Sequence, residues 1–430
     1  MTPEIKQRID KICHGEVPEG YQRTILGIVP KSWNKSRIDK ICRLSSGSTP
    51  RRDAVENFAG DILWVTSGEL KRRTIEDTRE KISETAVVNS HLEIYDPGTV
   101  VIAIYGLEAV GIRGTVSIIG KQCTISQACM AFTEFKGIDN EFFYYWYLNN
   151  GQVIGLRYAQ GTKQQNLSTD IVGSFPICFP SQGEQQKIAA ILTTQDKVIE
   201  LKEKRLAEKQ RQKKYLMQQL LTGKKRLPGF SEEWKIKSLN KLTEKQKKKN
   251  NGFQYHLVLS NSAQHGIVSQ DQEFDKEIAN EERIDGYYIV VPGAFVYNPR
   301  ISATAPCGPI NVNETGETGI MSPLYTVFTI SSPQISQDFL KYYFQSSCWY
   351  KYVKDVANYG ARHDRISISD GDFFDMPIPL PIKEEQSYIA EVLSAADHEI
   401  DLLRQDIEQE KQKKKALMQL LLTGIVRVKT

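Results

Sequence analysis

Two stretches of the chain carry apolar residues at alternating spacings of four and three. The first stretch begins at Ile188 and the second at Ile389. This spacing places the apolar side chains on one stripe of an α-helix, as in a coiled coil. The predicted seam consists of Ile188, Leu192, Ile199, Leu206, Leu216, Leu220, Ile389, Leu393, Ile400, Leu403, Ile407, Leu417 and Leu421.

Both stripes predict long helices with a defined end. Neither stretch contains Gly or Pro until Gly223 and Gly424, which stand where a terminating glycine is expected. About 39 residues at 1.5 Å each give a rod of roughly 58 Å. Ser181 and Glu184 are spaced for a capping box at the start of the first helix. Polar residues interrupt each stripe near its C-terminal third, where we expect the seam to be weakest.

The chain repeats itself at a shift of 201 positions. Residues 176–226 and 377–427 share 21 identities in 51 ungapped positions. Glu184-Gln185 pairs with Glu385-Gln386, and Asp196 pairs with Asp397. Since the similarity covers both long helices and their flanks, we infer a tandem duplication whose middle parts have diverged. The two helices are expected to form an antiparallel pair within one chain.

The segments between the repeated ends predict strands and turns with some helix. β-Branched and aromatic runs at 98–106 and 287–299 are bounded by Gly and Pro, which is typical of strands. Aromatic amphipathic runs at 141–150 and 338–347 predict helices in corresponding places. The predicted fold is α+β, with two mixed α/β modules, two long helices in an antiparallel intramolecular coiled coil, and a pseudo-two-fold internal repeat. The predicted domains are residues 1–180, 181–227, 228–382 and 383–430.

Composition changes this picture little. The 430 residues include 56 Lys and Arg against 52 Asp and Glu, and this net charge of +4 is lower than is usual for a protein that binds nucleic acid tightly by itself. The seven cysteines are scattered without a CxxC pair, and we expect no metal site. No apolar run approaches the roughly 18 residues of a membrane span, and the N-terminus does not read as a secretory signal. A cytoplasmic protein is expected.

The order of these parts resembles the specificity subunit of type I restriction-modification enzymes. The resemblance rests on PKSW (30–33), GDILWVTSGEL (60–70), GTKQQNLSTDIVGSFPICFPSQGEQQKIAAIL (161–192), MSPLYTVF (321–328) and PIPLPIKEEQSYIAEVL (377–393). Each half also closes on Leu-Leu-Thr-Gly. No single motif is specific, but the alternation of module and helix covers nearly the whole chain.

The resemblance implies a non-catalytic subunit that reads a bipartite, asymmetric DNA site with two target recognition domains. It further implies two methyltransferase subunits as partners and, with them, restriction subunits. Adenine methylation and ATP-dependent cleavage would then belong to the partners, together with S-adenosylmethionine, ATP and Mg²⁺. The adenine to be modified is expected to be flipped into the partner's pocket.

Candidate DNA contacts are basic and amide side chains in the modules, since Arg and Gln bond bidentately to guanine and adenine edges. They are Arg51, Arg52, Lys71, Arg72, Arg73, Lys163, Gln164, Gln165 and Asn166 in the first module, and Arg300, Arg362, His363 and Arg365 in the second. Each of them is also explained as an ordinary solvated surface residue.

Two other functions remain open on the sequence alone. Asp61, Glu69 and Lys71 loosely fit the carboxylate-and-lysine pattern of a metal-dependent nuclease, which would make the chain a self-contained DNA-cleaving enzyme. A coiled-coil adaptor without a nucleic-acid role is the other alternative. The loop Tyr297–Arg300 departs from an amino-methyltransferase motif, and the glycines at 106, 111 and 114 lack the spacing of a cofactor loop.

Overall fold

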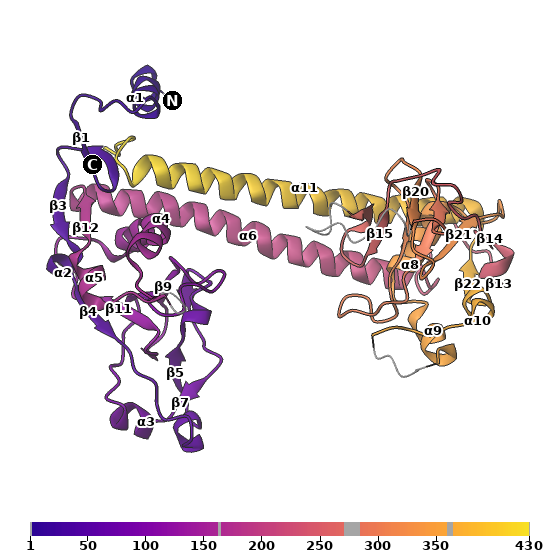
Figure 1. Ribbon diagram of the computed structural model, residues 1–430, viewed down its shortest axis with the longest axis horizontal. Coiled ribbons are helices and arrows are strands. Elements are labelled where there is room, and N and C mark those ends of the chain that lie inside the picture. The colour runs from indigo at the N-terminus through magenta and orange to yellow at the C-terminus, as the bar shows by residue number, and fades with distance from the viewer. Residues whose placement is uncertain (1, 162–164, 271–283, 359–363, 430) are drawn as a thin grey trace. The chain divides into compact units, whose positions relative to one another are not determined.

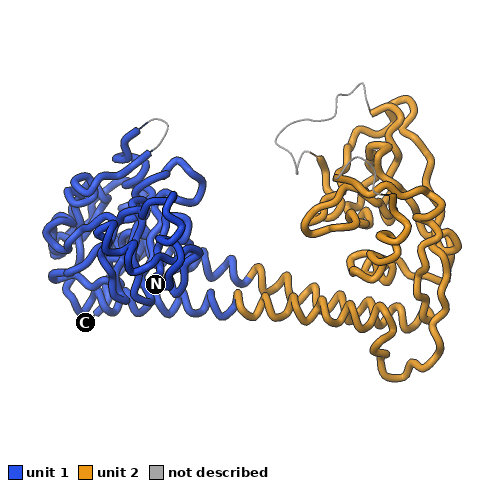
Figure 2. The backbone as a smooth tube through the Cα atoms, turned by 90° about the horizontal axis from the view of Figure 1, so that it is seen from below, with its two compact units in different colours: residues 1–202, 406–430 blue, residues 203–405 orange. Residues whose placement is uncertain are grey.

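The computed structural model describes residues 2–161, 165–270, 284–358 and 364–429. The chain forms two compact units, which Figure 2 shows in different colours. Unit 1 consists of Met1–Lys202 and Asp406–Thr430, and unit 2 of Glu203–Gln405. Each unit therefore combines one module with a piece of both long helices.

The two long helices are α6 (Gln182–Leu220) and α11 (Lys383–Leu421), each of 39 residues (Figure 1). Gly223 and Gly424 follow them with φ of 69° and 70°, a backbone conformation that favours glycine. The predicted helices and their stops thus match within two residues at each end. The carboxylate of Glu184 instead accepts hydrogen bonds from Arg427 and the backbone of Val428, so it serves the end of the other helix and not a capping box.

The first module is built on a five-stranded sheet in the order β4-β11-β8-β9-β6. A three-stranded sheet, β10-β5-β7, and the pairs β1-β2 and β12-β3 accompany it. The strands are β1 (Tyr21–Thr24), β2 (Gly27–Pro30), β3 (Asn34–Arg37), β4 (Arg43–Ser46), β5 (Ile62–Val65), β6 (Thr74–Ile75), β7 (Lys81–Ile82), β8 (Val100–Ala103), β9 (Val116–Ile119), β10 (Cys123–Ile125), β11 (Cys129–Thr133) and β12 (Pro176–Phe179). The helices are α1 (Pro3–Cys13), α2 (Ile38–Ile41), α3 (Glu84–Asn89), α4 (Asn140–Tyr158) and α5 (Thr169–Ser174), with 3₁₀ turns η1 (Val55–Phe58) and η2 (Ser67–Glu69).

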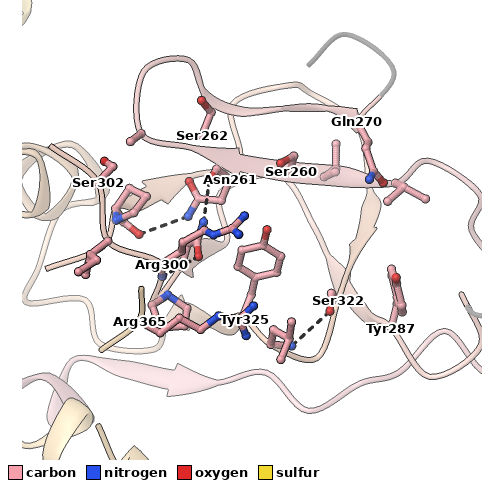
Figure 3. A pocket seen from close by; sticks show the side chains of 18 residues that line it. Ser260, Asn261, Ser262, Gln270, Tyr287, Arg300, Ser302, Ser322, Tyr325 and Arg365 are labelled. Carbon is pink, nitrogen blue, oxygen red and sulfur yellow. Dashed lines mark hydrogen bonds between the residues drawn. The ribbon is translucent and has the colours of Figure 1, made fainter. Parts of the chain in front are cut away.

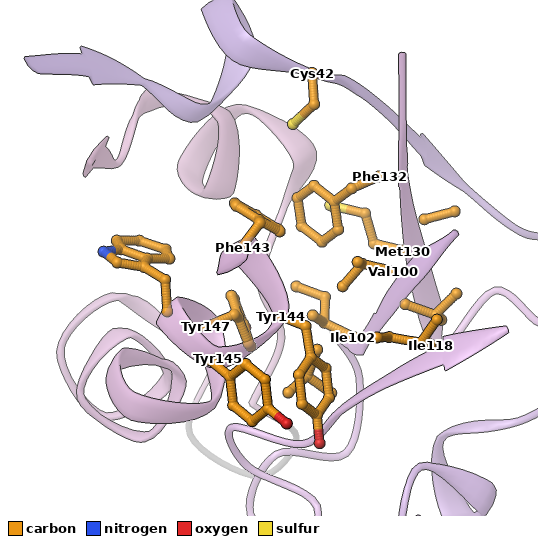
Figure 4. Close-up of a cluster of buried hydrophobic side chains, with 14 of the residues drawn as sticks. Cys42, Val100, Ile102, Ile118, Met130, Phe132, Phe143, Tyr144, Tyr145 and Tyr147 are labelled. Atoms are coloured by element: carbon orange, nitrogen blue, oxygen red, sulfur yellow. The ribbon is translucent and has the colours of Figure 1, made fainter. Parts of the chain in front are cut away.

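Helix α4 covers the five-stranded sheet and forms the core with it (Figure 4). Its aromatic run, predicted as a helix, buries Phe143 and Tyr147 against Phe132 of β11. Aromatic side chains bury large apolar areas, so this one helix supplies much of the apolar area in the core. Side chains from the start of α6 and the end of α11 join the same core, including Leu192 and Leu421.

The second module repeats four consecutive strands of the five-stranded sheet in the first. Its sheet runs β14-β21-β18-β19, matching β4-β11-β8-β9, and α8 packs against β19. The strands are β13 (Lys235–Ser238), β14 (Thr243–Lys245), β15 (Leu259–Ser262), β16 (Gly266–Ser269), β17 (Tyr288–Val290), β18 (Phe295–Tyr297), β19 (Ile310–Val312), β20 (Gly319–Met321), β21 (Thr326–Ile330) and β22 (Pro377–Leu380). The helices are α8 (Gln337–Gln345), α9 (Tyr350–Val356) and α10 (Asp370–Phe374), with η3 (Leu239–Lys241).

Each unit also repeats the strand pair that leads into its long helix. Asn34 pairs with Phe179 in β3-β12, and Lys235 pairs with Leu380 in β13-β22. Both partners differ by 201 positions, which is the shift found in the sequence. The duplication therefore extends to strand register.

Helices α6 and α11 run antiparallel within each unit. In unit 1, Lys202 bonds Asp406 and Glu410 at 2.8 and 2.9 Å, and Lys414 lies 2.6 Å from Asp196. In unit 2, Lys209 lies 2.8 Å from Glu399. The polar residues that interrupt the apolar stripes thus form ion pairs between the helices. Most of the thirteen predicted seam residues are buried; Leu206, Leu216 and Leu417 are partly buried.

The described residues contain no helix long and apolar enough to cross a membrane. Within the same part of the chain, no three His, Cys, Asp or Glu side chains are grouped to hold a metal ion. The seven cysteines are unpaired, and burial raises the pKa of Cys42, Cys123 and Cys129 to about 12.

Candidate nucleic-acid interface

Two loops meet at the end of β8 in the first module. The backbone N–H of Leu167 donates to Ile104 at 2.8 Å, and that of Leu107 donates to Gln165 at 3.1 Å. Arg113 donates to the side-chain oxygen of Gln165, whose own backbone N–H donates to Glu108 at 2.8 Å. Gln165 is therefore held by side chains of the neighbouring loop, and the predicted reader loop has a fixed base.

The second module has the same arrangement at the end of β18. The N–H of Ile366 donates to Pro299 at 2.9 Å, and the N–H of Ile301 donates to Asp364 at 3.0 Å. These bonds place Arg300 and Arg365 opposite one another in an antiparallel bridge. Like charges directly opposite are destabilising. Arg365 lies 3.6 Å from the carboxylate of Asp364, whereas Arg300 is exposed to solvent.

A cavity of about 460 Å³ opens beside this arginine pair (Figure 3). The ring of Tyr325 stands between Arg365 and the strand that carries Ser260, and Arg300 lies next to it. The opposite wall is fixed by Asn261, which donates to Val296 at 2.8 Å and accepts from Asn311 at 2.7 Å. A concave surface with two guanidinium groups and a rigid amide wall can bind the phosphates and base edges of a nucleic acid.

Arg51 and Arg52 are exposed but already have partners. Arg51 forms two bonds with Asp53, and both side chains are largely exposed. Arg52 bonds Glu80 through two nitrogens and lies 4.7 Å from the centre of the Phe58 ring. Exposed pairs of this kind contribute little stability, so Arg51 can exchange its carboxylate for a phosphate at small cost. Arg52 is held more firmly because it also stacks.

The side chains of the three adjacent basic residues at 71–73 lie in different surroundings. Lys71 and Arg72 are exposed. Arg73 is about three-quarters buried, bonds Glu141 and lies over the Tyr144 ring. Its Nε is also 4.0 Å from Asp196 on α6. The side chain of Arg73 therefore faces the long helix, while its two neighbours face solvent.

Four predicted contact residues, Lys163, Gln164, Arg362 and His363, lie outside the described residues. Asn166, at the edge of the first of these gaps, forms a backbone bridge with Gln160. The sequence did not single out Arg113, Glu108, Asn261 or Tyr325 as site residues, although the first two hold Gln165 and the last two line the cavity of the second module. Only spatial proximity marks them, since no motif joins positions so far apart in the chain.

The predicted nuclease pattern is opposed by the surroundings of Glu69. One carboxylate oxygen accepts from the backbone of Thr66 at 2.7 Å, and the other accepts from the backbone of Arg79 at 2.7 Å. The first bond belongs to the capping box of η2, and the second ties η2 to the backbone at Arg79, so Glu69 is a structural residue.

A second repeated site lies where each long helix begins. Glu385 accepts two bonds from Arg226, at 2.7 and 2.8 Å, and one from the Trp234 indole at 2.9 Å. Glu184 accepts two bonds from Arg427, at 2.8 and 2.7 Å. In each unit, an arginine in the segment after the C-terminal end of one long helix is bound by a glutamate in the first turn of the other long helix.

The adjacent glutamines anchor the modules. The side-chain oxygen of Gln185 accepts from the backbone of Asp139 at 2.7 Å, at the cap of α4. Gln386 accepts from the backbone of Ser336, also at 2.7 Å, at the cap of α8. Both glutamines are fully buried. The repeated Glu-Gln dipeptide thus joins a module, one long helix and the end of the other.

This repeated architecture agrees with a comparison to known families. A family described as "Type I restriction modification DNA specificity domain" matches residues 30–211 and 231–412. The two matches together cover most of the chain. The chain belongs to this family. It carries two copies of the specificity domain and is the DNA specificity subunit of a type I restriction-modification system.

Individual relatives are similar over different lengths. The type I restriction enzyme MjaVIII specificity subunit of Methanocaldococcus jannaschii is 23% identical over 93% of this chain and 94% of its own. The MjaIX specificity subunit of the same organism is 29% identical over 43% of this chain and 42% of its own, so the specificity subunit described here spans less than half of that relative. A chain from a solved type I R-M system, described for complex assembly and conformational transition, is 15% identical with a TM-score of 0.56, covering 93% of this chain and 99% of its own. This likeness supports the fold.

Proposed function

We propose that this specificity subunit reads a two-part, asymmetric DNA site, one half with each module, and holds two methyltransferase subunits at that site. The observation that carries the proposal is the repeated ion pair at the start of each long helix, Arg226 with Glu385 and Arg427 with Glu184. This ion pair gives each module the same attachment to both long helices. Two modules that differ in sequence but are attached in the same way can read two different half-sites, whereas a symmetric dimer reads two identical half-sites.

The proposal includes the arrangement of the whole chain. In it, α6 and α11 form one antiparallel coiled coil, and the two halves are related by a pseudo-two-fold axis. The antiparallel ion pairs within each unit support this. The proposed domains are a first target recognition domain at 1–180, a first spacer helix at 181–227, a second recognition domain at 228–382 and a second spacer helix at 383–430.

The proposed DNA contacts are those predicted from the sequence, with one change of emphasis. Arg300 and Arg365 flank the cavity of the second module, and Lys71 and Arg72 are exposed between η2 and β6 of the first. We assign Arg73 to positioning, because its guanidinium already bonds Glu141 beside α6. The weak net charge of +4 fits a complex in which partner subunits complete the hold on DNA.

The partners and their cofactors are likewise proposed. Family membership favours methyltransferase subunits and, with them, restriction subunits, and the solved relative described for complex assembly supports assembly with partners. S-adenosylmethionine, ATP and Mg²⁺ are assigned to those partners, and no cofactor is assigned to this chain. We propose the cytoplasm as the location because the substrate is chromosomal DNA.

Long-read mapping of methyladenine in cells with and without the gene tests the proposal. Deletion is expected to remove methylation at one asymmetric two-part motif, and the wild-type gene is expected to restore it. The double variant Arg300→Ala, Arg365→Ala should restore methylation poorly or relax one half of the motif, since a bidentate arginine contact is worth about 1–3 kcal/mol of discrimination. A methyladenine pattern that deletion leaves unchanged contradicts the proposal.

A further inference from the structure

A tyrosine, an aspartate and a lysine meet in each unit where the module rests on the long helices. In unit 1, the hydroxyl of Tyr145 on α4 donates to Asp196 on α6 at 2.6 Å. Lys414 on α11 lies 2.6 Å from the same carboxylate and 5.7 Å from the centre of the tyrosine ring. We call these three residues joint 1.

Unit 2 contains the same combination with the helices exchanged. Tyr342 on α8 donates to Asp397 on α11 at 3.1 Å. Lys213 on α6 lies 2.5 Å from Asp397 and 5.5 Å from the centre of the Tyr342 ring. We call these residues joint 2. The two aspartates and the two lysines are related by the shift of 201 positions, whereas the tyrosines come from the diverged modules.

The chemistry of each joint favours one orientation. A carboxylate that accepts from both a hydroxyl and an ammonium group forms charge-assisted bonds, which are shorter and stronger than neutral ones and directional. Burial raises the pKa of Tyr145 and Tyr342, with the nearby aspartates adding to the effect, so both hydroxyls keep their protons and remain donors. Each joint thus links one helix of a module, α4 or α8, to both long helices at one point.

The two joints differ in their surroundings. Joint 1 is reinforced by Arg73, which bonds Glu141 and Thr193 and whose Nε lies 4.0 Å from Asp196. Arg73 follows the exposed Lys71 and Arg72 directly, so this reinforcement connects a proposed DNA-contact loop to α6. Joint 2 instead lines a cavity of about 860 Å³ between α8 and the long helices. Asp397 in joint 2 is 38% exposed, against 18% for Asp196 in joint 1.

We infer that these joints are positioning elements that fix the angle of each module on the long helices, and that joint 2 thereby sets how strictly the subunit selects the number of base pairs between its two half-sites. The inference rests on the proposed function. A pair of long helices can fix the distance between the two half-sites only if each module is held at a constant angle to the helices. In B-DNA one added base pair rotates a half-site by about one tenth of a turn.

The test uses the subunit in cells with its natural partners, and compares methylation at native spacing with methylation at spacings one base pair longer or shorter. Tyr342→Phe and Asp397→Asn are expected to lower this selectivity about tenfold, because bonds to a charged group contribute on the order of one tenfold step or more. Tyr145→Phe should lower it less, since Arg73 still holds the first module. Asp397→Glu, which keeps the charge, should recover part of the selectivity.

Lys209→Gln is the matched control. It removes the 2.8 Å ion pair with Glu399 between the same two helices, one turn from Lys213, without touching a module. Unchanged spacing selectivity in Tyr342→Phe and Asp397→Asn overturns the inference, and so does an equal loss of methylation at every spacing. If deletion of the gene leaves methylation intact, the proposed function fails instead, so the two failures can be told apart.

Discussion

At the scale of residues, equivalent side chains in the two halves keep the same task where the structure constrains them. Glu184 and Glu385 each bind the arginine beyond the end of the other long helix. The tryptophans nearby are less equal: Trp234 donates to Glu385, whereas the buried indole nitrogen of Trp33 has no partner. Duplication therefore preserved the ion pair more strictly than the hydrogen bond beside it.

Arg72 and Arg73 allow the proposed DNA-contact role and the proposed structural role to be tested separately. Arg72→Ala should weaken DNA binding of the assembled complex, reduce its salt dependence by about one phosphate contact, and leave the unfolding midpoint unchanged. Arg73→Ala should destabilise the subunit by on the order of 2 kcal/mol, because a carboxylate loses its bond to a charged group. Salt-dependent binding and thermal unfolding measure the two effects. A drop in stability for Arg72→Ala, or none for Arg73→Ala, contradicts this division.

Part of this residue-level picture was predictable from the sequence. The repeated Glu-Gln dipeptide and the repeated Asp196 and Asp397 mark positions that both halves use. Their partners were not predictable, since Arg427 and Glu184 lie far apart in the chain and only folding brings them together. The role of Arg73 was hidden for the same reason, because three adjacent basic residues look alike until one of them meets a long helix.

At the scale of elements, apolar periodicity predicted the long helices well because their stripe is regular and their ends carry glycine. The strands of the modules were predicted only in part, since their short runs are bounded by irregular loops. Polar residues in the stripes were expected to weaken the pairing. In the structure these polar residues form bonds between the helices, including Gln195 and Lys202 with Glu410, and the weakness of the apolar seam stays a prediction.

Glu410 should give the helix pair a measurable pH dependence. The bonds from Gln195 and Lys202 lower the pKa of Glu410 from 4.5 to about 2. A lowered pKa in the folded state stabilises the protein above the unfolded value, and this contribution disappears as the pH falls from about 4.5 to about 2. Glu410→Gln should therefore lower the unfolding midpoint at pH 7. The difference in unfolding midpoint between this variant and the wild type should shrink as the pH falls from about 4.5 to about 2.

Thermal unfolding between pH 7 and pH 2 provides the measurement, with Glu408→Gln as an exposed control on the same helix. The control is expected to stay close to the wild type throughout. A constant difference between Glu410→Gln and the wild type at every pH would show that the carboxylate charge does not carry the effect.

At the scale of the whole molecule, duplication explains why one chain carries two specificity domains. The shared parts are the long helices, the strand pairs that lead into them and the ion pairs at their starts. The diverged parts include the loops at the ends of β8 and β18, where some of the candidate DNA contacts lie. Because the residues that attach the modules to the long helices are the same in both halves while the loops differ, one architecture can read two different DNA sequences.

A module exchange tests this account most directly. Residues 20–175 are replaced by the corresponding module of a relative with a different motif, leaving the long helices intact, and methyladenine is mapped in cells by long-read sequencing. The account predicts a motif in which one half changes while the other half and the spacing remain. A motif that is unchanged, or one in which both halves change, would contradict the assignment of one half-site to each module.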